Sequence, residues 1–418
     1  MDRRQKLKRA LAHQDGPVTM DFGGTAVTGM HVSVVAALRD HYGLERRPVR
    51  VIEPYQMLGD LDDDLRDALG VDVVGIYGRT TLFGFTLENW KEWTTPWGQP
   101  VLVPGQFNVT VKGGDVYIYP EGDTTVPPSG HMPEGGYFFD AIIRQEPIDE
   151  ERLNPDDNTE EFGPITDETL AYLNRAAQKA SASGRGVIAS FGGTAFGDIA
   201  LVPGPFLKHP KGIRDVAEWY VSTVMRQDYV HAMFARQLDH ALANLARIHA
   251  VVGDRVDAVF LCGTDFGTQQ AQFCSTATFD ELWLPYYSRM NDWIHRHTTW
   301  KTFKHSCGAV EPFMEHFIKA GFDIINPVQC SATGMDPRTL KDRYGERLVF
   351  WGGGVDTQKT LPFGTPAQVR EQVLRRCEIF SLKGGFVFDA IHNVQAKSPV
   401  ANVVAMIEAV KEFNGNKG

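Results

Sequence analysis

The strongest constraint on the fold is a regular alternation of strand-like and helix-like segments through most of the sequence. From about residue 186 onward, short runs rich in β-branched and aromatic residues are each followed by a stretch with apolar residues at three- and four-residue spacing. The strand-like runs are residues 186–193, 257–265, 300–308, 322–330, 347–356 and 384–392. Strands that alternate with helices form a parallel sheet, because each helix returns the chain to the edge where the strand began.

Two earlier runs, residues 17–24 and 71–78, fit the same pattern. Eight strand–helix units close into a (β/α)8 barrel, also called a TIM barrel. We therefore predict the α/β fold class and a single barrel domain over residues 1–418.

Residues 83–163 interrupt this rhythm. Residues 83–125 contain turns and short alternating segments, with Gly113-Gly114 at a position typical of a hairpin turn. Residues 126–163 are rich in Pro, Gly, Asp and Glu, which favours a long surface loop. We expect an antiparallel β insertion near the N-terminal third, which serves either as a lid over the substrate or as a contact in a homodimer.

Composition narrows the classes of partner. The net charge of -10 argues against a broad nucleic-acid-binding surface. No apolar run reaches the length of a membrane span, and the first residues lack the apolar core of a signal peptide. The five cysteines are scattered and odd in number, which is typical of a reducing compartment. We therefore expect a cytoplasmic protein that binds neither nucleic acid nor a membrane.

Polar and titratable residues collect at the predicted carboxyl ends of the strands, where core positions would be apolar. Active sites of α/β barrels lie at this end. We predict Asp265 and His392 as catalytic residues, although Asp265 would also suit a helix cap or a loop anchor. The predicted substrate-binding residues are Asp21, Tyr77, Asn326, Gln329, Asp356 and Asn393.

His305 and Cys307 form the most specific feature. Residues two apart on a strand face the same side, so the imidazole and the thiolate can point into one cavity. Zn²⁺ binds such pairs, and a catalytic zinc has three protein ligands and one open position. His392 is the predicted third ligand, and Cys330, at the end of the next strand, is the reserve. The alternative is a hydrogen-bonded histidine beside an inert buried cysteine.

Four segments, residues 262–287, 304–329, 350–358 and 384–410, together resemble the uroporphyrinogen decarboxylase superfamily. That superfamily includes the zinc methyltransferases of corrinoid and coenzyme M metabolism. The resemblance implies a (β/α)8 barrel with its cavity at the carboxyl ends of the strands. In the methyltransferase branch an HxC pair and a later cysteine hold zinc. His305 and Cys307 match the pair, whereas His392 occupies the later position and is similar to a histidine of the decarboxylases.

The decarboxylase itself carries an arginine-rich segment after its first strand. Here residues 20–31 contain neither lysine nor arginine to pair with the carboxylates of a porphyrinogen. The resemblance therefore implies a methyltransferase that demethylates a small O-, N- or S-methyl donor in favour of a corrinoid protein, with zinc activating the donor. One alternative is a metal-free decarboxylase or lyase for a small carboxylic acid or tetrapyrrole-like substrate, with His392 and Asp265 as acid and base. A non-catalytic binding barrel is another.

Overall fold

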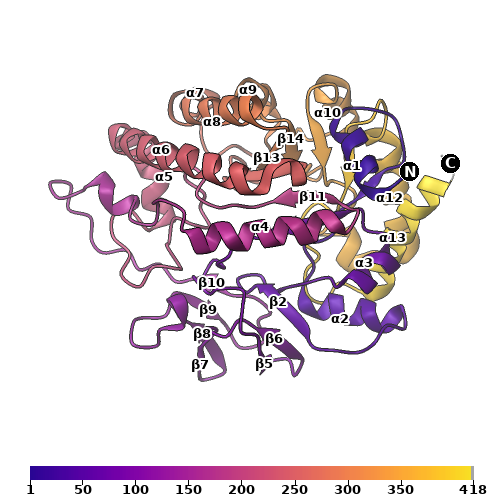
Figure 1. Cartoon of the computed structure of the whole chain (residues 1–418), viewed down its shortest axis with the longest axis horizontal. Coiled ribbons are helices and arrows are strands. Elements are labelled where there is room, and N and C mark those ends of the chain that lie inside the picture. Colours follow the sequence, from indigo (N-terminus) through magenta and orange to yellow (C-terminus); the bar gives the residue numbers. More distant parts are fainter. Residues whose placement is uncertain (416–418) are drawn as a thin grey trace.

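An eight-stranded parallel sheet forms the centre of the molecule in the computed structural model, which describes residues 1–415 (Figure 1). The strands follow one another in the order β1-β16-β15-β14-β13-β12-β11-β4. Their bounds are β1 (Thr19–Met20), β4 (Val73–Ile76), β11 (Gly186–Ala189), β12 (Ala258–Cys262), β13 (Lys301–His305), β14 (Ile324–Asn326), β15 (Val349–Trp351) and β16 (Phe386–Phe388). Each of these strands lies within one of the eight predicted runs, so the predicted fold class is confirmed.

The two ends of the sheet, β1 and β4, meet where the barrel closes. The backbone N–H of Asp72, just before β4, donates to the carbonyl of Met20 at 2.8 Å. The Asp72 carboxylate accepts in turn from the N–H of Met20 at 3.0 Å. A Cβ atom on Gly75 would lie only 2.2 Å from the carbonyl oxygen of Gly24, so glycine is required for this close approach. The sheet is therefore a nearly closed barrel.

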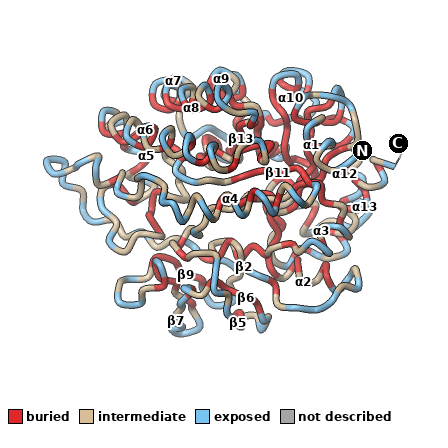
Figure 2. Tube along the Cα trace, viewed as in Figure 1, coloured by how far each residue is buried: buried red, intermediate tan, exposed pale blue. Residues whose placement is uncertain are grey.

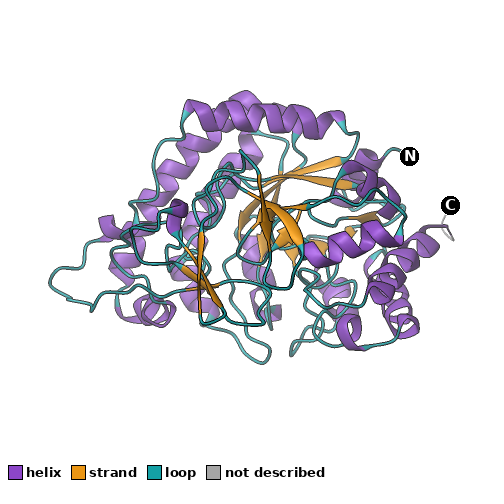
Figure 3. Ribbon diagram, turned by 90° about the horizontal axis from the view of Figure 1, so that it is seen from below, coloured by secondary structure: helices purple, strands orange, loops and turns teal. Residues whose placement is uncertain are grey.

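Helices surround the barrel, as the view in Figure 3 shows. They are α2 (Val32–His41), α3 (Asp63–Leu69), α4 (Asp167–Ala182), α5 (Val216–Met225), α6 (Gln227–Val252), α7 (Thr276–Leu282), α8 (Leu284–His297), α9 (Met314–Lys319), α10 (Pro337–Tyr344), α11 (Thr360–Phe363), α12 (Pro366–Phe380) and α13 (Val400–Gly415). Residues 278–297, whose spacing predicts one helix, are divided at Trp283, because Pro285 has no N–H to continue the hydrogen bonds of α7 into α8. Within residues 1–415, no helix has both the length and the apolar character needed to cross a membrane.

The first helix, α1 (Arg3–Leu11), closes the amino-terminal end of the barrel. Its Leu7, Ala10 and Leu11 share one buried cluster with inward-facing strand residues such as Phe303 and Trp351. Strands β11 and β13 are among the buried segments at the centre of Figure 2. Because side chains fill the barrel at this end, the carboxyl ends of the strands are left for a site.

Two small sheets lie outside the barrel, in the lower part of Figure 1. The antiparallel one has the order β10-β9-β8-β7, and the other has the order β3-β2-β6-β5. Their strands are β2 (Val49–Glu53), β3 (Leu58–Gly59), β5 (Lys91–Thr94), β6 (Pro100–Val103), β7 (Val109–Lys112), β8 (Asp115–Ile118), β9 (Gly130–Met132) and β10 (Asp140–Ala141). Gly113-Gly114 forms the turn between β7 and β8, as predicted.

The added sheets differ from the prediction in two respects. They include β2 and β3, which precede the barrel strand β4, so the region outside the barrel begins before residue 83. The expected loop at residues 126–163 contains β9 and β10, because residues 130–132 pair with β8 and extend its sheet. Pairing with β8 satisfies the hydrogen-bonding groups of this backbone. A Pro- and Gly-rich composition does not reveal such a pairing.

Candidate metal centre

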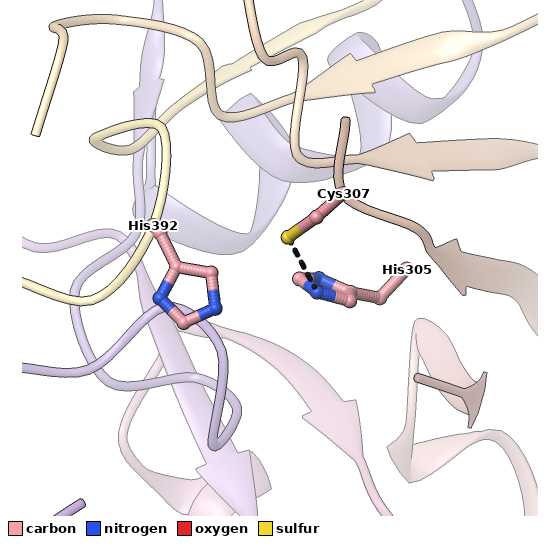
Figure 4. Close-up of side chains that lie close together, drawn as sticks. All are labelled: His305, Cys307 and His392. Carbon is pink, nitrogen blue, oxygen red and sulfur yellow. Dashed lines mark hydrogen bonds between the residues drawn. The ribbon is translucent and has the colours of Figure 1, made fainter. Parts of the chain in front are cut away.

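Three side chains converge at the carboxyl ends of the strands: His305, Cys307 and His392. His305 ends β13, Cys307 lies two residues further on, and His392 lies in the loop after β16. Their ligand atoms all lie within 4.8 Å of one another, and Cys307 Sγ is 3.3 Å from His305 Nε2. In Figure 4 the imidazole of His392 faces this pair from the opposite side. The reserve ligand Cys330 is not part of this cluster, and its thiol donates to the carbonyl of Val328 at 3.3 Å.

Asn326 fixes the orientation and the tautomer of His305. The Nδ1 atom of His305 lies 2.6 Å from Asn326 Oδ1, while Asn326 Nδ2 donates to the backbone carbonyl of Trp351 at 2.8 Å. Since that carbonyl can only accept, Asn326 presents its oxygen to the ring, and Nδ1 carries the proton. The lone pair of His305 is therefore on Nε2, which faces Cys307. A metal needs this tautomer.

Burial sets the charge of the three groups. Desolvation lowers the pKa of His305 and of His392 to about 4, so both imidazoles are neutral at pH 7. Desolvation also raises the pKa of the Cys307 thiol well above its usual range. The two nitrogen ligands are thus ready to bind a cation, whereas the thiol must first lose its proton to become a ligand.

Asp265 borders the cluster and anchors it. Its Oδ1 accepts from the backbone N–H of Cys307 at 2.7 Å and lies 3.9 Å from His305 Nε2. Burial raises the pKa of this carboxyl. Asp265 therefore anchors the turn that carries Cys307, which was the alternative role considered for it, and its catalytic role stays a prediction.

The turn after Cys307 depends on a glycine. Gly308 has a φ of +91°, and a Cβ atom there would lie 2.4 Å from the carbonyl carbon of Gly267. Its N–H donates to Gln329 Oε1 at 2.7 Å. The side chain of Gln329, predicted to bind substrate, thus holds the backbone that carries Cys307.

The other predicted substrate-binding residues also hydrogen-bond to the protein itself. Asp21 Oδ2 accepts from the indole N–H of Trp351 at 2.9 Å, and Tyr77 donates to the carbonyl of Gly23 at 2.8 Å. Asp356 accepts from backbone N–H groups of the loop that follows it. These bonds shape the mouth of the barrel, and a role in binding substrate stays a prediction.

Asn393 ties the loop that carries His392 to the amino-terminal part of the chain. Its Oδ1 accepts from the N–H of Gly29 at 2.6 Å. Its Nδ2 donates to the carbonyl of Ala26 at 2.9 Å and to Gln56 Oε1 at 2.8 Å. The position of the third candidate ligand therefore depends on residues from the opposite end of the sequence.

A small cavity of about 10 Å³ lies next to Asp265. None of the residues that line this cavity is a lysine or an arginine. Its wall includes Asp265 and the aromatic residues Trp219, Tyr220, Phe266, Phe273 and Trp283. These aromatic residues were not predicted from the sequence, because an aromatic side chain on an amphipathic helix has the same pattern whether it faces the core or a cavity.

A second buried carboxyl group was also missed. Asp389 is 1% exposed, and its Oδ2 has no hydrogen-bond partner among residues 1–415. Burial first, and then the nearby charge of Asp21, raises its pKa well above the usual range. Its position in the predicted strand-end run of residues 384–392 was the available signal.

Two comparisons with known proteins found a match, one to residues 209–413 and one to the fold of the whole chain. Residues 209–413 match the family model described as uroporphyrinogen decarboxylase (URO-D). A solved structure described as a methyltransferase from Methanosarcina mazei aligns with a TM-score of 0.54 and 12% identity, over 99% of each chain. At this identity the likeness shows the fold. No curated protein matches the sequence. The resemblance to the uroporphyrinogen decarboxylase superfamily is thus confirmed, and the matched residues contain His305, Cys307 and His392.

Proposed function

We propose that this chain, with its URO-D match over residues 209–413, is a zinc-dependent methyltransferase that moves a methyl group from a small O-, N- or S-methyl donor to a corrinoid protein. The observation that carries the proposal is the cluster of His305, Cys307 and His392, whose ligand atoms lie within 4.8 Å of one another. Two imidazoles and a thiolate suit zinc, and three protein ligands leave a fourth position for the donor.

The surroundings of the cluster also fit a zinc ion. Asn326 holds His305 in the tautomer whose free Nε2 faces the other ligands. Such outer hydrogen bonds are typical of metal-binding histidines. When bound, zinc would supply a Lewis acid that polarises the leaving atom of the donor.

Asp265 is our candidate for the residue that transfers a proton. Its Oδ1 is engaged by the N–H of Cys307, which leaves Oδ2 for the donor. Because burial raises its pKa, this carboxyl holds a proton at a higher pH than an exposed aspartate does. We therefore assign it the transfer of a proton to the oxygen, nitrogen or sulfur that loses the methyl group.

The test combines metal content with methyl transfer. Wild type and His305→Ala would be purified without chelators, analysed for zinc by mass spectrometry, and supplied with 2-methoxyphenol, trimethylamine or dimethyl sulfide. Reduced cobalamin would be the acceptor, and its methylation would be followed by absorbance.

The expected result is about one zinc per chain and methyl transfer in wild type, with both lost in His305→Ala. Cys330→Ala is the matched control, since this cysteine lies outside the cluster, and it should keep both. Full methyl transfer by His305→Ala would contradict the proposal.

A second candidate, a metal-free decarboxylase or lyase for a small acid, is favoured by one observation. Burial, and then the charge of Asp21, raises the pKa of Asp389 well above its usual range, so a carboxyl group that keeps its proton lies near the mouth of the barrel. Release of carbon dioxide that persists in the presence of a chelator and in His305→Ala would support this candidate over methyl transfer.

A further inference from the structure

Lys304 is a buried lysine to which the proposed function gives no role. It lies on β13 next to His305 and is 0% exposed. Adjacent residues on a strand face opposite sides, so its side chain points away from the barrel interior, which Phe303 faces. Its Nζ lies 5.0 Å from the ring centroid of Phe266 and 5.5 Å from that of Phe317. Among residues 1–415, no carboxylate oxygen lies within 4.0 Å of this nitrogen, so the charge is buried without an ion pair.

Stability does not explain the choice of lysine at this position. Transfer of a charge out of water is costly, and contacts with two aromatic rings offset only part of that cost. Even a buried ion pair can often be replaced by apolar side chains of similar volume without loss of stability. A methionine would fill the space between Phe266 and Phe317 without a buried charge. The ammonium group of Lys304 therefore needs a reason other than packing.

The hydrogen bonds of Lys304 supply such a reason. Its Nζ donates to the backbone carbonyl of Thr264, the residue before Asp265, and to the carbonyl of His305. The regular pairing of β12 with β13 ends at Cys262 and Lys304, after a shift in register. Past this point the ammonium group joins the two segments in place of the backbone ladder. Hydrogen bonds from a charged donor are stronger than those from a neutral one, which suits a single side chain in this position.

Two further hydrogen bonds join the same segments closer to the candidate metal centre. The N–H of Phe266 donates to Ser306 Oγ at 2.9 Å, and the N–H of Cys307 donates to Asp265 Oδ1 at 2.7 Å. The position of Asp265 relative to the ligands on the β13 side therefore depends on how the two segments are held. Lys304 is the first of these links along β13, and it also binds the carbonyl of a candidate ligand.

We propose that Lys304 is a positioning residue of the metal centre, which fixes the peptide of His305 and the residue before Asp265 in the arrangement that a bound metal requires. Lys304 acts through these two residues, because the two rings and the two carbonyls surround its ammonium group. The inference rests on the proposed function for the presence of a metal, whereas the role of Lys304 is measured separately, as metal affinity and ligand geometry.

The experiment compares Lys304→Met with Lys341→Met in the full chain. Lys341 is a matched control, because it is also buried, lies over the ring of Phe350 and donates to a carbonyl. That carbonyl belongs to Gly384, which precedes β16 at the opposite end of the barrel. Competition with a chromophoric chelator measures the zinc affinity, and the visible absorption of the Co²⁺-loaded protein reports the ligand geometry. Thermal melting of the metal-free protein measures stability.

We expect Lys304→Met to weaken zinc binding roughly 10- to 100-fold and to change the Co²⁺ spectrum, while it melts no lower than Lys341→Met. Lys341→Met should bind zinc as wild type does and give the wild-type Co²⁺ spectrum. Lys304→Arg keeps a positive charge and N–H donors, so it should bind zinc more tightly than Lys304→Met.

Three results would overturn the proposal. The first is a wild-type zinc affinity and Co²⁺ spectrum in Lys304→Met. The second is zinc binding by Lys304→Arg that is no tighter than that by Lys304→Met. The third is a Lys304→Met chain that melts below Lys341→Met or does not fold, since Lys304 would then serve the fold alone.

Failure of this proposal is distinguishable from failure of the proposed function. Zinc binding that depends on Lys304, without methyl transfer by wild type, contradicts the methyltransferase and keeps the positioning role. Methyl transfer by wild type, with zinc binding that is unchanged in Lys304→Met, contradicts the positioning role alone.

Discussion

Asn326 shows how one side chain can decide what its neighbour does. It joins the end of β13 to the end of β14 and, through the carbonyl of Trp351, to β15. The sequence placed Asn326 at the mouth of the barrel but suggested a contact with substrate, because polarity at a strand end does not reveal which neighbour the amide faces. The candidate ligands were predictable from their strand ends, whereas the tautomer of His305 required the hydrogen bonds.

Replacing Asn326 by alanine should weaken zinc binding about 10- to 100-fold, because Nδ1 of His305 loses its acceptor and the ring is no longer held in one tautomer. Competition with a chromophoric chelator measures the affinity. Asn402→Ala is the control, since Asn402 is a buried amide that bonds to carbonyls near α11. Equal weakening in both variants would mean that the effect is a general loss of packing.

Asp21 should make the folded protein less stable as the pH rises, because burial raises its pKa. Burial raises its pKa to about 6 in the folded protein, from 3.8. A raised folded-state pKa contributes stability that is fully present below the unfolded pKa and lost as the pH rises through about 6. Wild type should therefore lose free energy of unfolding relative to Asp21→Asn between pH 4 and pH 7, by up to about 3 kcal/mol. Denaturant unfolding at several pH values measures this, and a difference that does not vary with pH would contradict it.

At the scale of elements, the turn that follows β13 carries Cys307 into the site. Its path requires the left-handed backbone of Gly308 and the contact of this residue with Gly267. A side chain at this position would push the β13 turn away from the loop after β12, which carries Asp265.

Gly308→Ala should lower both the melting temperature and the affinity for zinc. The left-handed backbone alone costs an alanine about 1–2 kcal/mol, and the clash with Gly267 adds to this. Gly334→Ala separates the two effects, because Gly334 has a φ of +77° with no atom within 4 Å of the added Cβ. Thermal melting should show the larger loss for Gly308→Ala, and equal losses would rule out the close contact as the cause.

The elements of the barrel were more predictable than those outside it. Each of the eight predicted runs contains a strand, since alternation of strands and helices is visible in local periodicity. Strands β2 and β3 were not predicted, because β2 pairs with β6 about fifty residues away and no local pattern records that partner. The aromatic cavity was missed for the same reason, since Tyr220 and Phe273 meet only in the folded protein.

At the scale of the whole molecule, the two halves of the chain are interdependent. Residues 209–413, which match the URO-D model, contain β12 to β16, whereas β1, β4 and β11 lie outside that range. The barrel also needs α1 at its amino-terminal end and Gly29, Ala26 and Gln56 to hold Asn393.

A fragment of residues 209–413 should therefore fail to fold by itself, because its sheet lacks three strands and exposes both edges. We expect no cooperative thermal transition and no stoichiometric zinc binding from the fragment. Co-expression with residues 1–208 should restore both, as judged by circular dichroism and metal analysis. A fragment that melts cooperatively and binds zinc alone would show that the matched half is an independent unit.

The pairing of β16 with both β1 and β15 has a consequence for the order of events on the ribosome. The chain emerges with its amino end first, so β1 waits for a partner that is synthesised more than 360 residues later. His305 and Cys307 leave the ribosome well before His392, and until β16 docks the nascent chain offers only two of the three candidate ligands. Insertion of β16 thus closes the barrel and brings the third candidate ligand to the other two in one step.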